Sequence, residues 1–137
     1  MSPTIRAGRA SDLDSVLRLW TEAAAEPTHT DDAAGLDILM GRDPGALIVA
    51  EDDGRLVGSV IAAWDGWRGS IYRLVVAPSH RRMGLSRRLL HQAEARLSEQ
   101  GAVRLQAIVI ETETLATAFW ASTGWDRQVE RIRFVKG

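Results

Sequence analysis

Apolar residues repeat at helical spacing in four segments of the chain. In residues 85–100, leucine or alanine recurs every fourth position, which places one apolar stripe along a helix. A glycine or proline follows each segment and is expected to end the helix there. The spacing therefore predicts helices over residues 11–24, 33–40, 85–100 and 113–122.

The first of these helices carries a start signal and an end signal. Ser11 followed by Asp14 is an acidic variant of the capping pattern found at helix N-termini. Pro27 ends the helix, and the surrounding polar residues 26–32 are expected to form a loop.

Apolar runs of strand length dominate the middle of the chain. They are separated by Asp53-Gly54, a two-residue hairpin signal, and by the turn-forming stretch WDGWRGS. Ala46–Ala77 is therefore predicted to be a three-stranded antiparallel meander. Further strands are expected at Thr4–Gly8, at residues 103–110 and, from the alternation in the tail, at Val129–Val135.

The order of these elements predicts a mixed α/β fold, and the composition supports a single domain. The 137 residues are 45% hydrophobic and 26% charged, so residues 1–137 are expected to share one core. A formal charge of -1 gives no overall attraction to nucleic acid or to a membrane. Cysteine is absent and the three histidines lack regular ligand spacing, so no metal is expected. A polar start and no long apolar run favour a cytoplasmic location.

One stretch concentrates positive charge in this nearly neutral chain. HRRMGLSRRLL, residues 80–90, holds four arginines around Gly84 at a predicted strand-to-helix junction, and no acidic residue occurs between Asp65 and Glu94. A glycine turn before a helix N-terminus presents backbone N–H groups and a positive dipole end, which favours a pyrophosphate. On these residues alone, an amphipathic helix with solvated arginines is an equally good interpretation.

The sequence around this stretch resembles motif A of the GNAT N-acetyltransferase superfamily. LVVAPSHRRMGLSRRLL fits the pattern of Arg or Gln, two residues, Gly, one residue, then Gly or Ala, with Ser86 in the last position. LATAFWASTGW is similar to the family's AxxLYExxGF segment, and WDGWRGS is similar to the same turn in the bacterial RimI-like branch. The resemblance covers nearly the whole chain. It implies a central mixed, mostly antiparallel sheet of six to seven strands, about four helices, and a splay between the fourth and fifth strands.

Carried over to this sequence, the resemblance implies acetyl-CoA as co-substrate. Backbone groups of the fourth strand would hold the pantetheine arm, and an amide near Leu74 or Val75 would polarise the thioester carbonyl and stabilise the oxyanion. Amides of the glycine turn would hold the pyrophosphate. The implied cofactor-binding residues are Leu74, Val75, Val76, Arg81, Arg82, Met83, Gly84, Leu85, Ser86, Arg87 and, by packing, Trp120.

The catalytic groups are harder to assign. Where the family often has a tyrosine acid, this chain has Trp120, whose indole cannot donate a proton at neutral pH. The remaining candidates are Tyr72, Glu111, Glu113 and Asp65. Each has a structural alternative, respectively as a sheet side chain, a surface charge, a first-turn acid and a turn former. Direct transfer with water-relayed deprotonation is therefore the preferred mechanism.

On the acceptor side, the resemblance places the turn containing Trp64, Asp65 and Trp67 beside the amine. Aromatic walls with Asp65 and the loop acids Asp31 and Asp32 would suit a cationic amine. The acceptor class stays open between a small molecule, a lysine and a peptide N-terminus. The alternative function is a catalytically weak or inactive acyl-CoA-binding sensor, and a nucleic-acid-binding helix is a weaker alternative. The oligomeric state stays open, with a homodimer through the edge of the C-terminal strand as one possibility.

Overall fold

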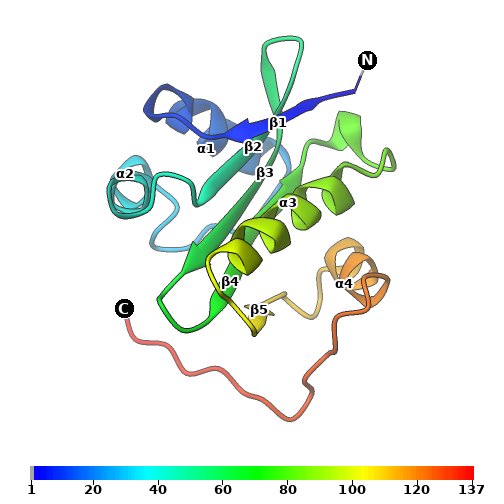
Figure 1. Cartoon of the computed structure of the whole chain (residues 1–137). Helices are drawn as coiled ribbons and strands as arrows, with labels where there is room; N and C mark the ends of the chain where they lie inside the picture. Colours follow the sequence, from blue (N-terminus) through cyan, green and yellow to red (C-terminus); the bar gives the residue numbers. More distant parts are fainter. Residues whose placement is uncertain (1) are drawn as a thin grey trace. The chain divides into compact units, whose positions relative to one another are not determined.

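The computed structural model describes residues 2–137, so Met1, the first residue of the predicted 1–137 domain, lies outside it. The chain divides into two compact units, one ending at Ala107 and one from Ile108 to Gly137. The first unit contains the sheet and three helices, and the second contains one helix (Figure 1). The strands are β1 (Thr4–Ala7), β2 (Leu47–Asp52), β3 (Arg55–Trp64), β4 (Gly69–Val76) and β5 (Leu105–Ala107); the helices are α1 (Leu13–Glu22), α2 (Ala33–Arg42), α3 (Leu85–Glu99) and α4 (Thr114–Ala121), with 3-10 turns η1 (Ala10–Asp12) and η2 (Pro78–His80).

The five strands form one mixed sheet in the order β1-β2-β3-β4-β5. All neighbouring pairs are antiparallel except β4 and β5, which are parallel and joined by α3. The predicted meander is confirmed by β2, β3 and β4. The mixed α/β class is confirmed as well.

The prediction of six to seven strands is wrong, because the described residues contain five. The predicted strand at residues 103–110 is reduced to β5, and Val129–Val135 form no strand. In this tail Val129, Ile132 and Phe134 are exposed by 73%, 79% and 88%. An apolar pattern makes a strand only where a neighbouring strand pairs its N–H and C=O groups. The C-terminal strand edge that left a homodimer open is therefore not formed among the described residues.

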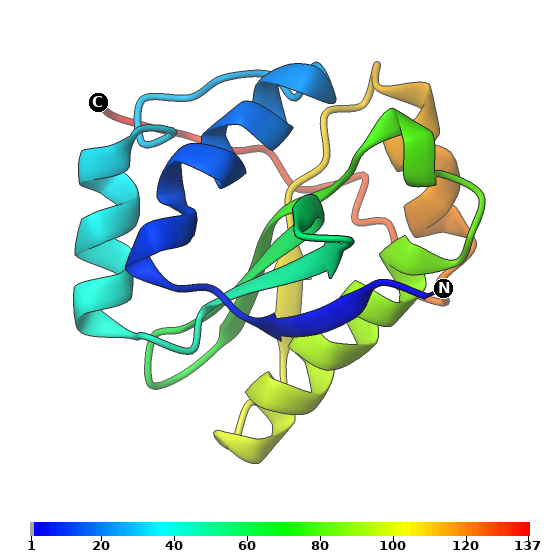
Figure 2. The same cartoon turned by 90° about the horizontal axis from the view of Figure 1, so that it is seen from above.

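The helices of the first unit cover both faces of its sheet. α1 and α2 lie on one face and α3 lies on the other (Figure 2). The predicted stripe of α3 is confirmed, since its four members are at most 2% exposed and pack on the sheet. These residues are Leu85, Leu89, Ala93 and Leu97.

The start of the first helix differs from the predicted cap. Asp12, not Ser11 or Asp14, accepts the backbone N–H of Arg9 at 2.7 Å, and the chain makes one 3-10 turn before α1. The same carboxylate binds the guanidinium of Arg6 at 2.7 and 3.1 Å. The Arg6 hydrogen bond, followed by the Arg9 N–H, holds the pKa of Asp12 below its ordinary value of 3.8. The cap was misplaced because Asp12 is chosen by its contact with β1, which lies outside the local pattern.

Asp12→Asn is expected to lower the free energy of unfolding at pH 7 by about 2–3 kcal/mol, since Arg6 loses its buried carboxylate. Because the folded-state pKa of Asp12 is depressed, its contribution is present above the unfolded-state pKa and is lost as pH falls through the folded-state pKa. Urea unfolding of the wild type and of Asp12→Asn, at neutral and at strongly acidic pH, measures this contribution. The difference in free energy of unfolding between the two proteins should shrink in acid, and a difference that does not change with pH would contradict the assignment.

Candidate functional site

The glycine turn lies between β4 and α3, as the sequence predicts. After η2 the backbone takes positive φ angles at Arg82 (64°) and Gly84 (76°), and the helix begins at Leu85. The first hydrogen bond back to the turn runs from the N–H of Arg88 to the carbonyl of Gly84 at 3.2 Å. The N–H groups of Leu85 and Ser86 precede that bond, so they have no partner carbonyl inside the helix. The segment is therefore not continuous helix, and the helix itself does not use the N–H groups of Leu85 and Ser86.

The space above the turn is open. A Cβ built on Gly84 would meet no atom within 4 Å, so a ligand can approach the backbone closely. The chain therefore fits a pyrophosphate at this point through open space, a left-handed glycine and a helix N-terminus together.

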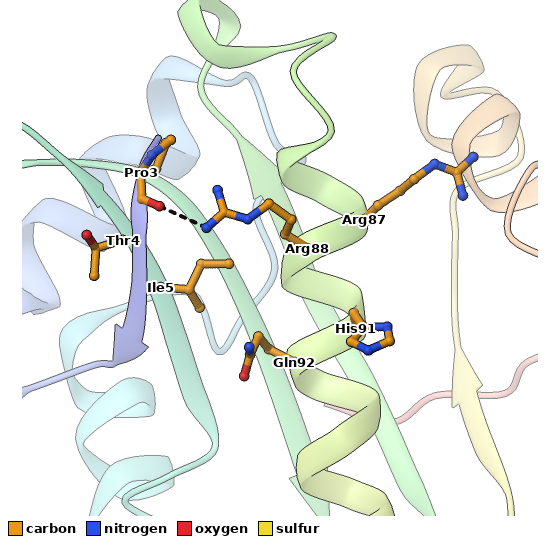
Figure 3. Close-up of a pocket in the computed structure, with 7 residues that line it drawn as sticks. All are labelled: Pro3, Thr4, Ile5, Arg87, Arg88, His91 and Gln92. Carbon is orange, nitrogen blue, oxygen red and sulfur yellow. Dashed lines mark hydrogen bonds between the residues drawn. The ribbon is translucent and has the colours of Figure 1, made fainter. Parts of the chain in front are cut away.

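The arginines around the turn do not converge on one point. Arg88 donates to the carbonyl of Pro3 at 2.9 Å, and Figure 3 shows Arg87 extending from the other side of α3, away from β1. Arg81 reaches the carbonyl of Ala23 at 3.5 Å. The guanidinium groups of Arg81 and Arg88 therefore bind backbone carbonyls rather than gathering over the turn.

Arg87 and Arg88 also line a cavity of about 620 Å³ between β1 and α3 (Figure 3). This cavity lies beside the first turns of the helix rather than over its N-terminus. The Arg88 side chain closes part of it by bonding Pro3. The cavity is therefore separate from the glycine turn.

His80 joins the turn to the hairpin of β2 and β3. Its Nε2 lies 2.7 Å from the Asp52 carboxylate, and its Nδ1 lies 2.8 Å from the Ser79 hydroxyl. Sequence reasoning gave His80 no role, because a histidine beside a helix is commonly surface. The contact fixes the residue directly before Arg81 and so restricts the start of the turn.

β4 carries a bulge near its C-terminal end, at Arg73 and Leu74. Tyr72 pairs with Ile61 and Val75 pairs with Ser59, so two residues of β4 oppose one residue of β3. One of the two, Arg73, has a φ of 51°, a left-handed conformation that is uncommon for arginine. Such a bulge leaves backbone groups outside the regular ladder and redirects them.

A buried hydrogen-bond chain holds the bulge in place. The indole N–H of Trp20 donates to the Ser59 hydroxyl at 2.9 Å, and that hydroxyl donates to the carbonyl of Arg73 at 2.9 Å. Trp20 and Ser59 are 5% and 0% exposed. Sequence reasoning missed this chain. Its only signal was one serine in the otherwise apolar strand VGSVIAAW.

The bulge lies where β4 loses its second neighbour. The parallel ladder with β5 ends at Ile71 and Ala107, whereas β4 continues to Val76. Over residues 72–76, the β5 side of β4 therefore has no paired strand within the first unit. This stretch contains the predicted cofactor-binding residues Leu74, Val75 and Val76.

The predicted acceptor-side residues lie at the β3–β4 turn. Trp64 ends β3, and Trp67 is 72% exposed with the Arg68 guanidinium stacked 4.4 Å from its ring centroid. Asp65 accepts the backbone N–H groups of Arg68 and Trp67, each at 2.7 Å. The Arg68 N–H, followed by that of Trp67, lowers the pKa of Asp65. Asp65 is therefore a turn-forming carboxylate in this structure.

The loop acids predicted to attract a cationic amine have structural partners. Asp31 forms an ion pair with Arg73, and Asp32 caps α2 by accepting the Gly35 N–H at 2.7 Å. Tyr72, on β4 beside the bulge, is 48% exposed. The first unit thus places one candidate catalytic group, Tyr72, next to the bulge.

Three predicted residues belong to the second unit. Glu111 forms an exposed ion pair with Arg127 at 3.2 Å. Glu113 precedes α4, and its carbonyl accepts the Thr117 N–H. Trp120 packs edge-on against Trp125 with the ring centroids 4.8 Å apart.

The geometry defines an α/β protein with a bulged strand that has one open edge, followed by a glycine turn at a helix N-terminus. The model of the acetyltransferase (GNAT) family matches residues 13–125. An acetyltransferase of Pectobacterium atrosepticum is 33% identical over 107 residues, covering 78% of this chain and 76% of the relative. One of Yersinia enterocolitica is 30% identical over 124 residues, covering 90% and 88%. The chain belongs to the GNAT family and is an acetyl-CoA-dependent N-acetyltransferase.

Solved structures share the fold. The PaiA N-acetyltransferase of Thermoplasma acidophilum, in complex with coenzyme A, aligns with a TM-score of 0.79 at 17% identity over 93% of this chain and 92% of that one. Naa20 of Chaetomium thermophilum, in complex with a bisubstrate analogue, aligns with a TM-score of 0.77 at 26% identity, over 88% of this chain and 70% of that one. The ribosomal-protein-S18-alanine N-acetyltransferase of Escherichia coli aligns with a TM-score of 0.69 at 20% identity, over 89% of this chain and 76% of that one.

Residues 2–137 lack two further features. None of their helices has the length and apolar character needed to cross a membrane. Nor do three or more of their His, Asp and Glu side chains gather where a metal ion could bind.

Proposed function

We propose that this protein moves the acetyl group of acetyl-CoA directly to a primary amine in a ternary complex. The observation that carries the proposal is the continuity of one backbone path. The open edge of β4, the bulge at Arg73 and the turn at Gly84 follow one another within residues 72–86. An extended thioester arm bound along this edge has its pyrophosphate end at the turn and its acyl end at the bulge.

A backbone N–H at the bulge, from Leu74 or Val75, is the proposed donor to the thioester carbonyl. A donor held by packing stabilises the charge that develops on that oxygen without reorganising. The chain that includes Trp20 and Ser59 supplies this rigidity. Leu74, Val75 and Val76 hold the arm, and the segment from Arg81 to Arg87 holds the pyrophosphate.

The acceptor amine must lose a proton before it attacks. An alkyl amine has an unperturbed pKa of about 10.4 and a peptide N-terminus about 7.7–8.0. In the first unit, Asp31 is ion-paired and Asp32 caps a helix, so neither is placed as a base. We therefore propose water-relayed deprotonation, with Tyr72 as the nearest titratable hydroxyl. Glu111 and Glu113 are retained as candidate proton acceptors, and Trp120 as a packing residue.

We also place the chain in the RimI-like branch, with residues 1–137 as one catalytic domain. The turn WDGWRGS and the similarity in fold to the ribosomal-protein-S18-alanine N-acetyltransferase support the branch. The family match across residues 13–125 runs through the boundary between the two units and supports the single domain. A peptide N-terminus is then the first acceptor to test, with Trp64, Asp65 and Trp67 on its side.

Thiol release from acetyl-CoA, measured against a panel of peptides, lysine derivatives, polyamines and aminoglycosides, tests the proposal. We expect saturable release with at least one amine and no covalent acetyl-enzyme on intact-mass analysis. Tight acetyl-CoA binding without release for any amine would instead favour the sensor function that Trp120 suggested. A trapped acetyl-enzyme would contradict direct transfer.

A further inference from the structure

The side chain of Arg73 leaves the bulge toward the α1 side of the sheet. Its guanidinium carbon lies 5.4 Å from the centroid of the Trp20 ring. Its Nε donates to one oxygen of Asp31 at 3.0 Å, and a terminal nitrogen binds the other oxygen. The same terminal nitrogen donates to the carbonyl of Glu26 at 2.7 Å. Arg73 therefore binds the loop between α1 and α2 at two points, the Asp31 carboxylate and the Glu26 carbonyl.

Asp31 also organises that loop internally. Its carboxylate accepts the Thr28 N–H at 2.7 Å, and its own N–H donates to the Thr28 carbonyl at 3.1 Å. The side chains of Arg73 and Asp31 are only 17% and 12% exposed, although residues 26–30 are all exposed. A guanidinium that bonds both oxygens of a carboxylate in a largely buried site fixes the relative orientation of the two side chains. The pair is thus the anchor of an otherwise solvated loop.

We propose that Arg73 is a positioning residue for the acceptor side of the reaction, acting through Asp31. Its backbone forms the bulge at which the proposed function places the acetyl group, and its side chain holds loop 26–31 beside that bulge. The inference rests on that proposed placement. One residue then sets the distance between the reacting carbonyl and the loop that faces the incoming amine.

The proposal reverses the role first expected for Asp31. A carboxylate that attracts a cationic amine would be hindered by Arg73, so removing Arg73 would improve cationic acceptors. A carboxylate that anchors a loop needs Arg73, so removing either partner would impair every acceptor similarly. The two roles therefore give opposite signs for the same substitution.

The test compares Arg73→Gln, Arg73→Lys and Asp31→Asn with the wild type. For Arg73→Gln we expect kcat/KM for the best amine of the panel to fall about 10–100-fold, because small displacements of reacting groups have effects of this size. The Kd for acetyl-CoA should change less than about threefold, since the turn is untouched. The kcat/KM of Arg73→Lys should lie between those of the wild type and Arg73→Gln, because lysine keeps the charge but cannot bond both oxygens of Asp31 in the same way.

A second, related ion pair provides the matched control. Arg96 binds Asp43 and donates to the carbonyl of Ala62 at 2.8 Å, with side-chain exposures of 19% and 23% for the pair, far along α3 from the turn. Arg96→Gln should lower stability as Arg73→Gln does, yet leave kcat/KM within about twofold of the wild type. Equal losses of kcat/KM in both variants would reduce Arg73 to a stabilising residue and overturn the proposal.

Hydrogen exchange of peptides covering residues 26–31 separates this inference from the proposed function. Faster exchange in Arg73→Gln but not in Arg96→Gln is expected, and unchanged exchange overturns the anchor. A gain of activity toward spermidine in Arg73→Gln also overturns it. If the wild type releases no thiol with any amine, the proposed function fails, and exchange alone decides whether Arg73 anchors the loop.

Discussion

Gly84→Trp should weaken acetyl-CoA binding at least about 100-fold while the protein stays folded. An indole at this position would fill the open space above the turn and block the N–H groups of Leu85 and Ser86. The left-handed φ of 76° adds strain of about 1–2 kcal/mol for any side chain, which lowers Tm by only a few degrees. Isothermal titration with acetyl-CoA and thermal unfolding measure the two effects.

Two control variants separate bulk from strain. Gly84→Ala adds the strain with little volume, so most of the affinity should remain. Gly101→Trp adds an indole at another open glycine with a φ of 101°, at the far end of α3, and should leave the Kd unchanged. Wild-type affinity in Gly84→Trp would show that the pyrophosphate binds elsewhere.

Ser59→Ala should lower kcat about 10–100-fold with a smaller effect on the Kd for acetyl-CoA. The substitution removes the hydroxyl that accepts from Trp20 and donates to the carbonyl of Arg73, so both groups are left without that partner. The bulge can then relax toward regular pairing. The unpaired groups should also lower the free energy of unfolding by about 2 kcal/mol.

Val16→Ala is the stability-matched control for this variant. Val16 is fully buried in α1, and its truncation should cost about 1–2 kcal/mol without touching the bulge. Single-turnover kinetics at saturating amine compare the two. If Val16→Ala loses as much kcat as Ser59→Ala, the loss follows stability and the serine has no positioning role.

Local patterns predicted most of the first unit. The hairpin signal at Asp53-Gly54 predicted β2 and β3, and the four-residue repeat predicted the buried face of α3. Gly84 fell at the start of α3, where the motif placed it. Each of these features depends on residues within a few positions of one another, which is why a single sequence reveals them.

Patterns failed where a distant partner decides the outcome. The tail from Val129 to Val135 has strand-like composition but no pairing strand in the described structure. Asp12 takes the helix-start role from Ser11 because Arg6 of β1 reaches it. Asp31, which the sequence suggested for an amine, is bound by an arginine that lies 42 residues away along the chain.

The sequence by itself determined the order of the elements from β1 to α4, the glycine turn and the family, because these depend on periodicity and short motifs. Only the tertiary structure decided where the β4 bulge falls and what holds it. That choice depends on Trp20, Ser59 and Asp31, which three separate segments bring to Arg73. Hydrogen bonds between such distant groups form only after packing has placed them, so no local signal records them.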